Sequence, residues 1–141
     1  MDMGDYNLQR FLDAQQGDYE RALTEVRNGR KYSHWIWYIF PQLKGLGMSY
    51  NSQYYGISGK EEAEAYLAHP VLGERLREIT SAFLQLKSKT AEEVFGSLDA
   101  MKVLSCMTLF NEVAAGDLFW QVIDRYYQGE TDEMTKRMLD K

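Results

Sequence analysis

Apolar residues recur at helical spacing along most of this chain, and that pattern restricts the fold more than any other feature of the sequence. The clearest run follows the i, i+3, i+4, i+7 spacing of one helix face. It consists of Leu8, Phe11, Leu12, Gln15, Tyr19, Ala22, Leu23 and Val26. The dipeptide Gly17-Asp18 interrupts this run, so we expect two helices, over about residues 6–16 and 18–28.

Capping signals and apolar faces predict the helices that follow. Ser58-x-x-Glu61 and Thr90-x-x-Glu93 both match the capping box, in which two side chains satisfy backbone N–H groups at a helix start. The first predicts a helix through about residue 68, and the second a short turn ending at residue 96. Further helices are expected after Pro70, from about Leu98 to Ala115, after a capping Asp117, and over Thr131–Leu139.

Two segments are less regular. His34–Phe40 fits either a short buried helix or a strand, because periodicity does not separate the two over so few residues. Helix is favoured, since no other segment supplies a strand partner. Gln42–Gly59 is loop-like, with one helical turn expected at Ser52–Tyr55, and a loop of that length is often functional. The sequence therefore predicts a single compact all-α domain over residues 1–141, with about seven or eight short helices and residues 1–5 disordered.

Composition excludes several classes of protein. The chain has 141 residues, which is the usual size of one domain, and its single Cys excludes an internal disulfide framework. Two isolated His and one Cys form no ligand set, so neither a metal nor another cofactor is expected. The longest apolar run, Trp35–Phe40, is far too short to span a membrane, and Met1–Arg10 lacks the apolar core of a signal peptide. We therefore expect a cytoplasmic protein.

The charges and aromatic rings are unevenly distributed. The net charge is −5, which argues against a uniformly basic nucleic-acid binder, yet Val26–Lys60 contains no Asp or Glu at all. This acid-free segment holds five basic residues and eight of the 19 aromatic residues. The sequence thus leaves room for one local anion site within an otherwise acidic chain.

The acid-free segment supplies the candidate site. Our leading hypothesis is a cleft for a phosphorylated, nucleotide-like small molecule, with Arg30, Lys31, Ser33 and Lys44 on the phosphate and Trp35, Trp37 and Tyr55 on the ring. His34 is the candidate catalytic residue, because its free pKa lies near neutrality, and Gln42 would help to orient the ligand. Lys102 and Ser105 share a helix face and could line the same cleft. The sequence does not decide whether any reaction takes place.

Three other interpretations remain open. The segment could be a solvated basic turn followed by a buried aromatic helix, with His34 in a structural role. It could bind single-stranded RNA or DNA, with the aromatic rings as stacking platforms. It could also form a protein-interaction surface or a homodimer interface, because aromatic residues and Arg are enriched there.

Several motifs resemble one known family. They are Leu8-Gln9-Arg10-Phe11, Gly29-Arg30-Lys31, Ser33-His34-Trp35-Ile36-Trp37, Phe40-Pro41-Gln42-Leu43, His69-Pro70-Val71-Leu72-Gly73 and Ser105-Cys106-Met107-Thr108. Together they resemble the bacterial family catalogued as domain of unknown function 1810, in order, from about residue 7 to residue 139. The resemblance implies an all-α domain of bacterial cytosolic type, and it implies no activity. The label calpastatin, which some members carry, does not suit a compact, Pro-poor chain.

Overall fold

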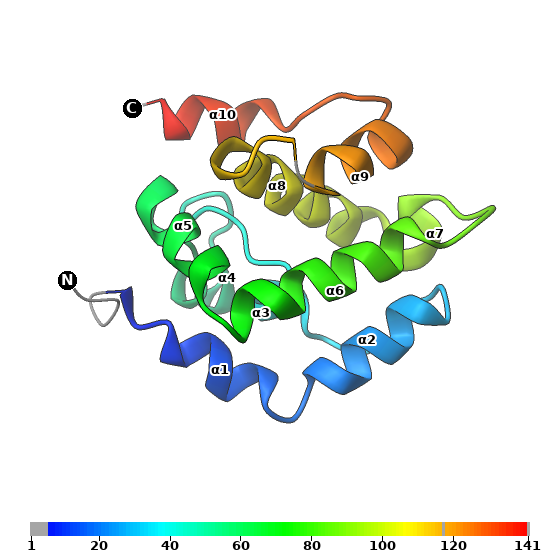
Figure 1. Cartoon of the computed structure of the whole chain (residues 1–141), viewed down its shortest axis with the longest axis horizontal. Coiled ribbons are helices and arrows are strands. Elements are labelled where there is room, and N and C mark those ends of the chain that lie inside the picture. Colours follow the sequence, from blue (N-terminus) through cyan, green and yellow to red (C-terminus); the bar gives the residue numbers. More distant parts are fainter. Residues whose placement is uncertain (1–5, 117, 141) are drawn as a thin grey trace.

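The protein is built from helices. The computed structural model describes residues 6–116 and 118–140, and this part of the chain forms ten helices with no sheet (Figure 1). Their bounds are α1 Gln9–Gln15, α2 Tyr19–Arg27, α3 Ile36–Ile39, α4 Tyr50–Tyr54, α5 Lys60–Ala68, α6 Leu72–Leu84, α7 Ala91–Phe95, α8 Ser97–Val113, α9 Leu118–Tyr127 and α10 Glu133–Leu139. The predicted all-α, single-domain fold is confirmed. The expected disorder of residues 1–5 and the expected cap at Asp117 fall outside the described residues.

Helix α8 is the centre of the fold. It crosses the middle of the molecule and packs against α5, α7, α9 and α10 (Figure 1). Its residues from 105 to 110 are all buried, so apolar side chains point to several sides of the helix and not to a single face. Helices α2, α5 and α9 in turn pack on α6, which extends the same core. Within the described residues, no helix is long and apolar enough to cross a membrane.

The two predicted capping boxes have different outcomes. Thr90 and Glu93 form the complete reciprocal box at the start of α7, as expected. Ser58 does not cap α5, because Gly59 occupies the capping position. The backbone N–H of Ser58 instead donates to the Glu62 carboxylate at 2.7 Å, and the other oxygen of that carboxylate lies 2.9 Å from the Arg10 guanidinium. The buried ion pair thus moves the helix start by one residue.

The irregular segments are held by specific hydrogen bonds. Residues 36–39 form one helical turn, α3, which resolves the ambiguity of this segment in favour of helix. In the long loop, an isolated parallel bridge joins Leu43 to Ile57. Helix α4 begins two residues earlier than expected, because the Ser49 side chain accepts the N–H of Ser52. The bridge and α4 therefore divide the long loop after Pro41 into short pieces between fixed points.

Arg10 fixes the end of this loop. Its guanidinium donates to the carbonyl oxygens of Tyr54 at 2.8 Å and Gly56 at 3.0 Å, and also to two carbonyls of its own segment. Its charge is paired with Glu62, and both side chains are buried. One residue of α1 thereby joins the end of α4 to the start of α5.

Candidate functional site

The segment from residue 30 to residue 35 is organised by Glu25 on α2. The Glu25 carboxylate accepts the backbone N–H groups of Tyr32 and Ser33, the Ser33 hydroxyl at 2.7 Å and the Trp35 indole N–H at 2.9 Å. Partial burial would raise the pKa of this carboxyl, but the hydrogen bonds outweigh it and lower the pKa to about 2. An acid from outside the acid-free segment therefore holds Ser33 and Trp35, two of the predicted site residues.

A second acid joins Lys31 to Lys102. The Lys31 ammonium lies 2.8 Å from the Asp99 carboxylate in the first turn of α8, and its side chain is only 8% exposed. Lys102 lies 3.6 Å from the other oxygen of the same carboxylate. Each ammonium also lies over an indole ring, Lys31 over Trp35 at 5.1 Å and Lys102 over Trp37 at 5.5 Å. The structure thus brings together four predicted site residues.

These contacts change the role of the two tryptophans. Trp35 has no exposed surface, so it belongs to the core and does not offer a face to a ligand ring, contrary to the expectation from sequence. Trp37 is half-buried and lines a cavity together with Gln42 and Tyr55. That cavity measures about 10 Å³, which is room for one water at most and not for a nucleotide. Tyr55 itself packs against Phe11 and Tyr38, and burial raises the pKa of its hydroxyl.

The remaining predicted residues are separated. His34 is exposed. Ser105 is buried, and its hydroxyl bonds to the Met101 carbonyl one turn back and to the Asp132 carboxylate, so it does not line the cleft expected from sequence. Ser105 therefore ties α8 to the start of α10. The predicted cluster does not form a single cleft.

An open hollow lies beside Arg30. We call it the Arg30 hollow; its volume is about 440 Å³, and it is lined by Arg30, Lys31, Lys89, Glu92, Glu93, Val94, Phe95 and Gly96. Arg30 is exposed, and its guanidinium lies 5.3 Å from the ring of Tyr32. The stem of Lys89 lies on Gly29, where an added Cβ would come within 3.3 Å of Lys89 Cε. Two basic residues distant in sequence thus meet at one hollow.

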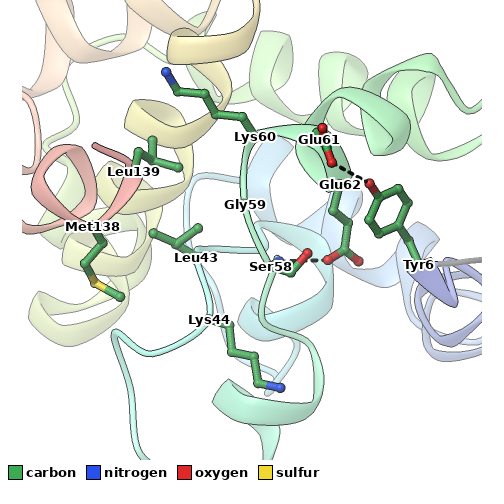
Figure 2. A pocket seen from close by; sticks show the side chains of 10 residues that line it. All are labelled: Tyr6, Leu43, Lys44, Ser58, Gly59, Lys60, Glu61, Glu62, Met138 and Leu139. Carbon is green, nitrogen blue, oxygen red and sulfur yellow. Dashed lines mark hydrogen bonds between the residues drawn. The ribbon is translucent and has the colours of Figure 1, made fainter. Parts of the chain in front are cut away.

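Figure 2 shows a second open hollow, which we call the Lys44 hollow. Its volume is about 390 Å³, and its lining includes Lys44, Ser58, Lys60, Glu61 and Met138. The ammonium groups of Lys44 and Lys60 point away from each other, toward opposite ends of the hollow. Glu61 faces Tyr6, whose hydroxyl donates to it at 3.3 Å. The two cations therefore do not converge on a single point.

Sequence reasoning missed two parts of the Arg30 hollow. Lys89 follows Ser88, which adopts a left-handed backbone with φ of 63°, in a turn that carried no functional signal. Gly96 has φ of 83° and precedes α8, and no side chain caps that helix. Only the packing of the segment after α2 against α7 brings these residues to Arg30. Among the described residues, no group of three or more His, Cys, Asp or Glu side chains could hold a metal ion.

Comparison with known proteins identifies the family. The family model described as "Protein of unknown function (DUF1810)" matches residues 5–139. The chain belongs to this family. It is also similar to the crystal structure of the conserved hypothetical protein Rv1873 from Mycobacterium tuberculosis, with a TM-score of 0.95 and 43% sequence identity. That match covers 97% of this chain and 99% of the other. No curated protein gives a match.

Proposed function

We propose that this DUF1810 protein binds a phosphorylated small molecule in the Arg30 hollow. The observation that carries the proposal is the meeting of Arg30 and Lys89 at this hollow, with no described carboxylate within ion-pair distance of either. An Arg guanidinium matches a phosphate with two parallel hydrogen bonds, and a Lys ammonium adds a mobile point charge. The volume, about 440 Å³, lies within the usual range for small-molecule sites.

The start of α8 adds to the attraction for an anion. Gly96 lines the hollow, and the 17-residue helix that follows it has no side-chain cap. The N-terminus of a helix carries partial positive charge and free N–H groups, which favour a phosphate. The positive φ of Gly96 also suits glycine, which brings the backbone to the wall of the hollow.

The acidic residues of the hollow limit the negative charge that a ligand can carry. Glu92 and Glu93 line it together with three basic residues, one of which, Lys31, is already paired with Asp99. The Glu93 carboxylate accepts the N–H of Thr90 in the capping box. One anionic group suits this balance of charge better than a polyanionic strand does. A cytoplasmic location is part of the proposal, and the free, buried thiol of Cys106 fits it.

A thermal-shift screen tests the proposal. Inorganic phosphate, nucleotides and sugar phosphates are the probes, and a ligand at 100 times its Kd adds about 2.7 kcal/mol to the free energy of unfolding. We expect Arg30→Ala and Lys89→Ala each to abolish the shift without lowering basal stability. Lys87→Ala is the matched control, because Lys87 is exposed in the same turn but does not line the hollow. A shift that survives in the Arg30→Ala, Lys89→Ala double variant would place the ligand elsewhere.

A further inference from the structure

We propose that a separate surface, formed by Lys44, Lys60, Tyr50 and Tyr54, binds single-stranded nucleic acid. We call it the tyrosine–lysine strip. It lies on α4, on the start of α5 and on the loop between Leu43 and Ile57, and it shares no residue with the Arg30 hollow. The proposal therefore does not depend on the proposed function above.

Two exposed tyrosines form a ready platform for a base. The rings of Tyr50 and Tyr54 lie one turn apart on α4, almost parallel, with an interplanar angle of 8° and a centroid distance of 5.7 Å. Tyr50 is 77% exposed and Tyr54 is 42% exposed, and neighbouring Met48 is exposed as well. The ring of Tyr55 supports Tyr54 edge-on at 4.8 Å. Stacking on such rings tolerates any base, because every base has a π face.

The two lysines are spaced for a strand and not for a single phosphate. They stand at opposite ends of the Lys44 hollow and point apart (Figure 2). Cations that point apart in this way suit different phosphates of one strand better than a single phosphate group. Lys44 also lies beside the residues that follow α4, since its backbone N–H donates to the Ile57 carbonyl and an added Cβ on Gly56 would come within 2.5 Å of its Cα. The strip therefore runs from Lys60 across the hollow to Lys44 and on to α4.

The local charge fits a polyanion. No described carboxylate lies within ion-pair distance of Lys44 or Lys60, and the whole of residues 26–60 contains no acid. Of the two acids beside Lys60, Glu62 is buried and paired with Arg10. The other, Glu61, receives the Tyr6 hydroxyl on the side away from Lys44 (Figure 2). Repulsion of a strand would come from Glu61 and from Glu64, which is exposed one turn after Lys60 on α5.

Fluorescence anisotropy with a labelled oligothymidylate of about 12 nucleotides, within the usual size of such sites, tests the proposal. We expect salt-sensitive binding of the single strand and weaker binding of a duplex. Tyr50→Ala and Tyr54→Ala should each weaken binding at least about fivefold, while Tyr50→Phe, which keeps the ring, should retain it. Lys44→Ala and Lys60→Ala should each reduce the slope of log K against log salt by about 0.7.

Two controls keep the result specific. Trp120→Ala removes an exposed aromatic ring on α9 and should leave binding unchanged. The Arg30→Ala, Lys89→Ala double variant should also bind the strand normally. That result would distinguish strand binding at the tyrosine–lysine strip from ligand binding in the Arg30 hollow. Absence of any anisotropy change, equal binding of duplex and single strand, or full binding by a Tyr50→Ala, Tyr54→Ala double variant would each overturn the proposal.

Discussion

At the scale of single residues, Glu25 fixes the backbone that presents Arg30 and Lys31. It accepts four hydrogen bonds from three residues, and its ionised form is favoured by them. Hydrogen bonds to a charged group contribute about 1.5–3 kcal/mol each. The segment from residue 30 to residue 35 lacks regular structure for most of its length, so this carboxylate holds it together with the Lys31 contacts to Asp99 and Val94.

Glu25→Gln is expected to destabilise the fold by about 1.5–3 kcal/mol at neutral pH. The pKa of Glu25 falls from 4.5 to about 2 on folding, so its carboxylate stabilises the protein fully above about pH 5. That stabilisation is lost as the pH falls from about 5 toward 2. Urea unfolding of both proteins at several pH values should therefore show a stability gap that narrows over this range. A gap of constant size would contradict the role of the charge.

The Arg10–Glu62 pair is expected to behave as a buried ion pair. Arg10→Met leaves the Glu62 carboxylate buried without its partner, and such changes destabilise by about 3–5 kcal/mol. Arg21 offers a matched control, because its side chain is 56% exposed and its partner Asp18 lies only three residues away. Arg21→Met should change the free energy of unfolding by about 0.5 kcal/mol or less. Equal effects of the two variants in urea unfolding would show that burial does not matter here.

At the scale of elements, the spacing of apolar residues predicted where the long helices lie better than it predicted where each helix begins and ends. Residues 19, 22, 23 and 26 are buried on α2, as the periodicity required. The start of α5 predicted from sequence was wrong. A distant partner, Arg10, fixes the Glu62 carboxylate, which accepts the backbone N–H of Ser58. A capping motif in the sequence indicates only which nearby side chains could accept the backbone N–H groups at a helix start. A buried ion pair from another helix can override it.

The two capping motifs give a test at this scale. Thr90→Ala removes a side chain that caps α7, and loss of such a cap destabilises by about 0.5–2 kcal/mol. Ser58→Ala changes the same position of an identical pattern, but that side chain caps nothing, so its effect should stay within about 0.5 kcal/mol. Chemical denaturation of both variants makes the comparison. A larger loss for Ser58→Ala than for Thr90→Ala would contradict the geometry.

At the scale of the whole molecule, segregation of charge along the sequence did not become segregation in space. Lys31 is paired with Asp99 on α8, and Glu25 and Glu62 hold residues at both ends of the acid-free segment. Arg30 was among the predicted site residues, whereas Lys89, which lines the same hollow, was not. Their meeting depends on how α2 and α7 pack on the common core, and a single sequence carries no signal of that packing.

The single thiol lies at the centre of this core and reports on the whole fold. Cys106 is fully buried on α8, and burial raises the pKa of its thiol. A disulfide reagent reacts with the exposed thiolate, so labelling requires unfolding. Because a domain of this size is stable by at least about 5 kcal/mol, native labelling should be at least about a thousandfold slower than that of a free thiol. The labelling rate should rise with urea in proportion to the unfolded fraction.

An exposed thiol provides the reference for this measurement. In a Cys106→Ala background, Ser97→Cys places a thiol on the exposed first turn of α8, and it should react at nearly the rate of a small thiol. Rapid, stoichiometric labelling of Cys106 in the native protein would mean that the core around α8 opens without global unfolding. In that event α5, α7, α9 or α10 would have to separate from α8 as a unit, since all four pack directly against it.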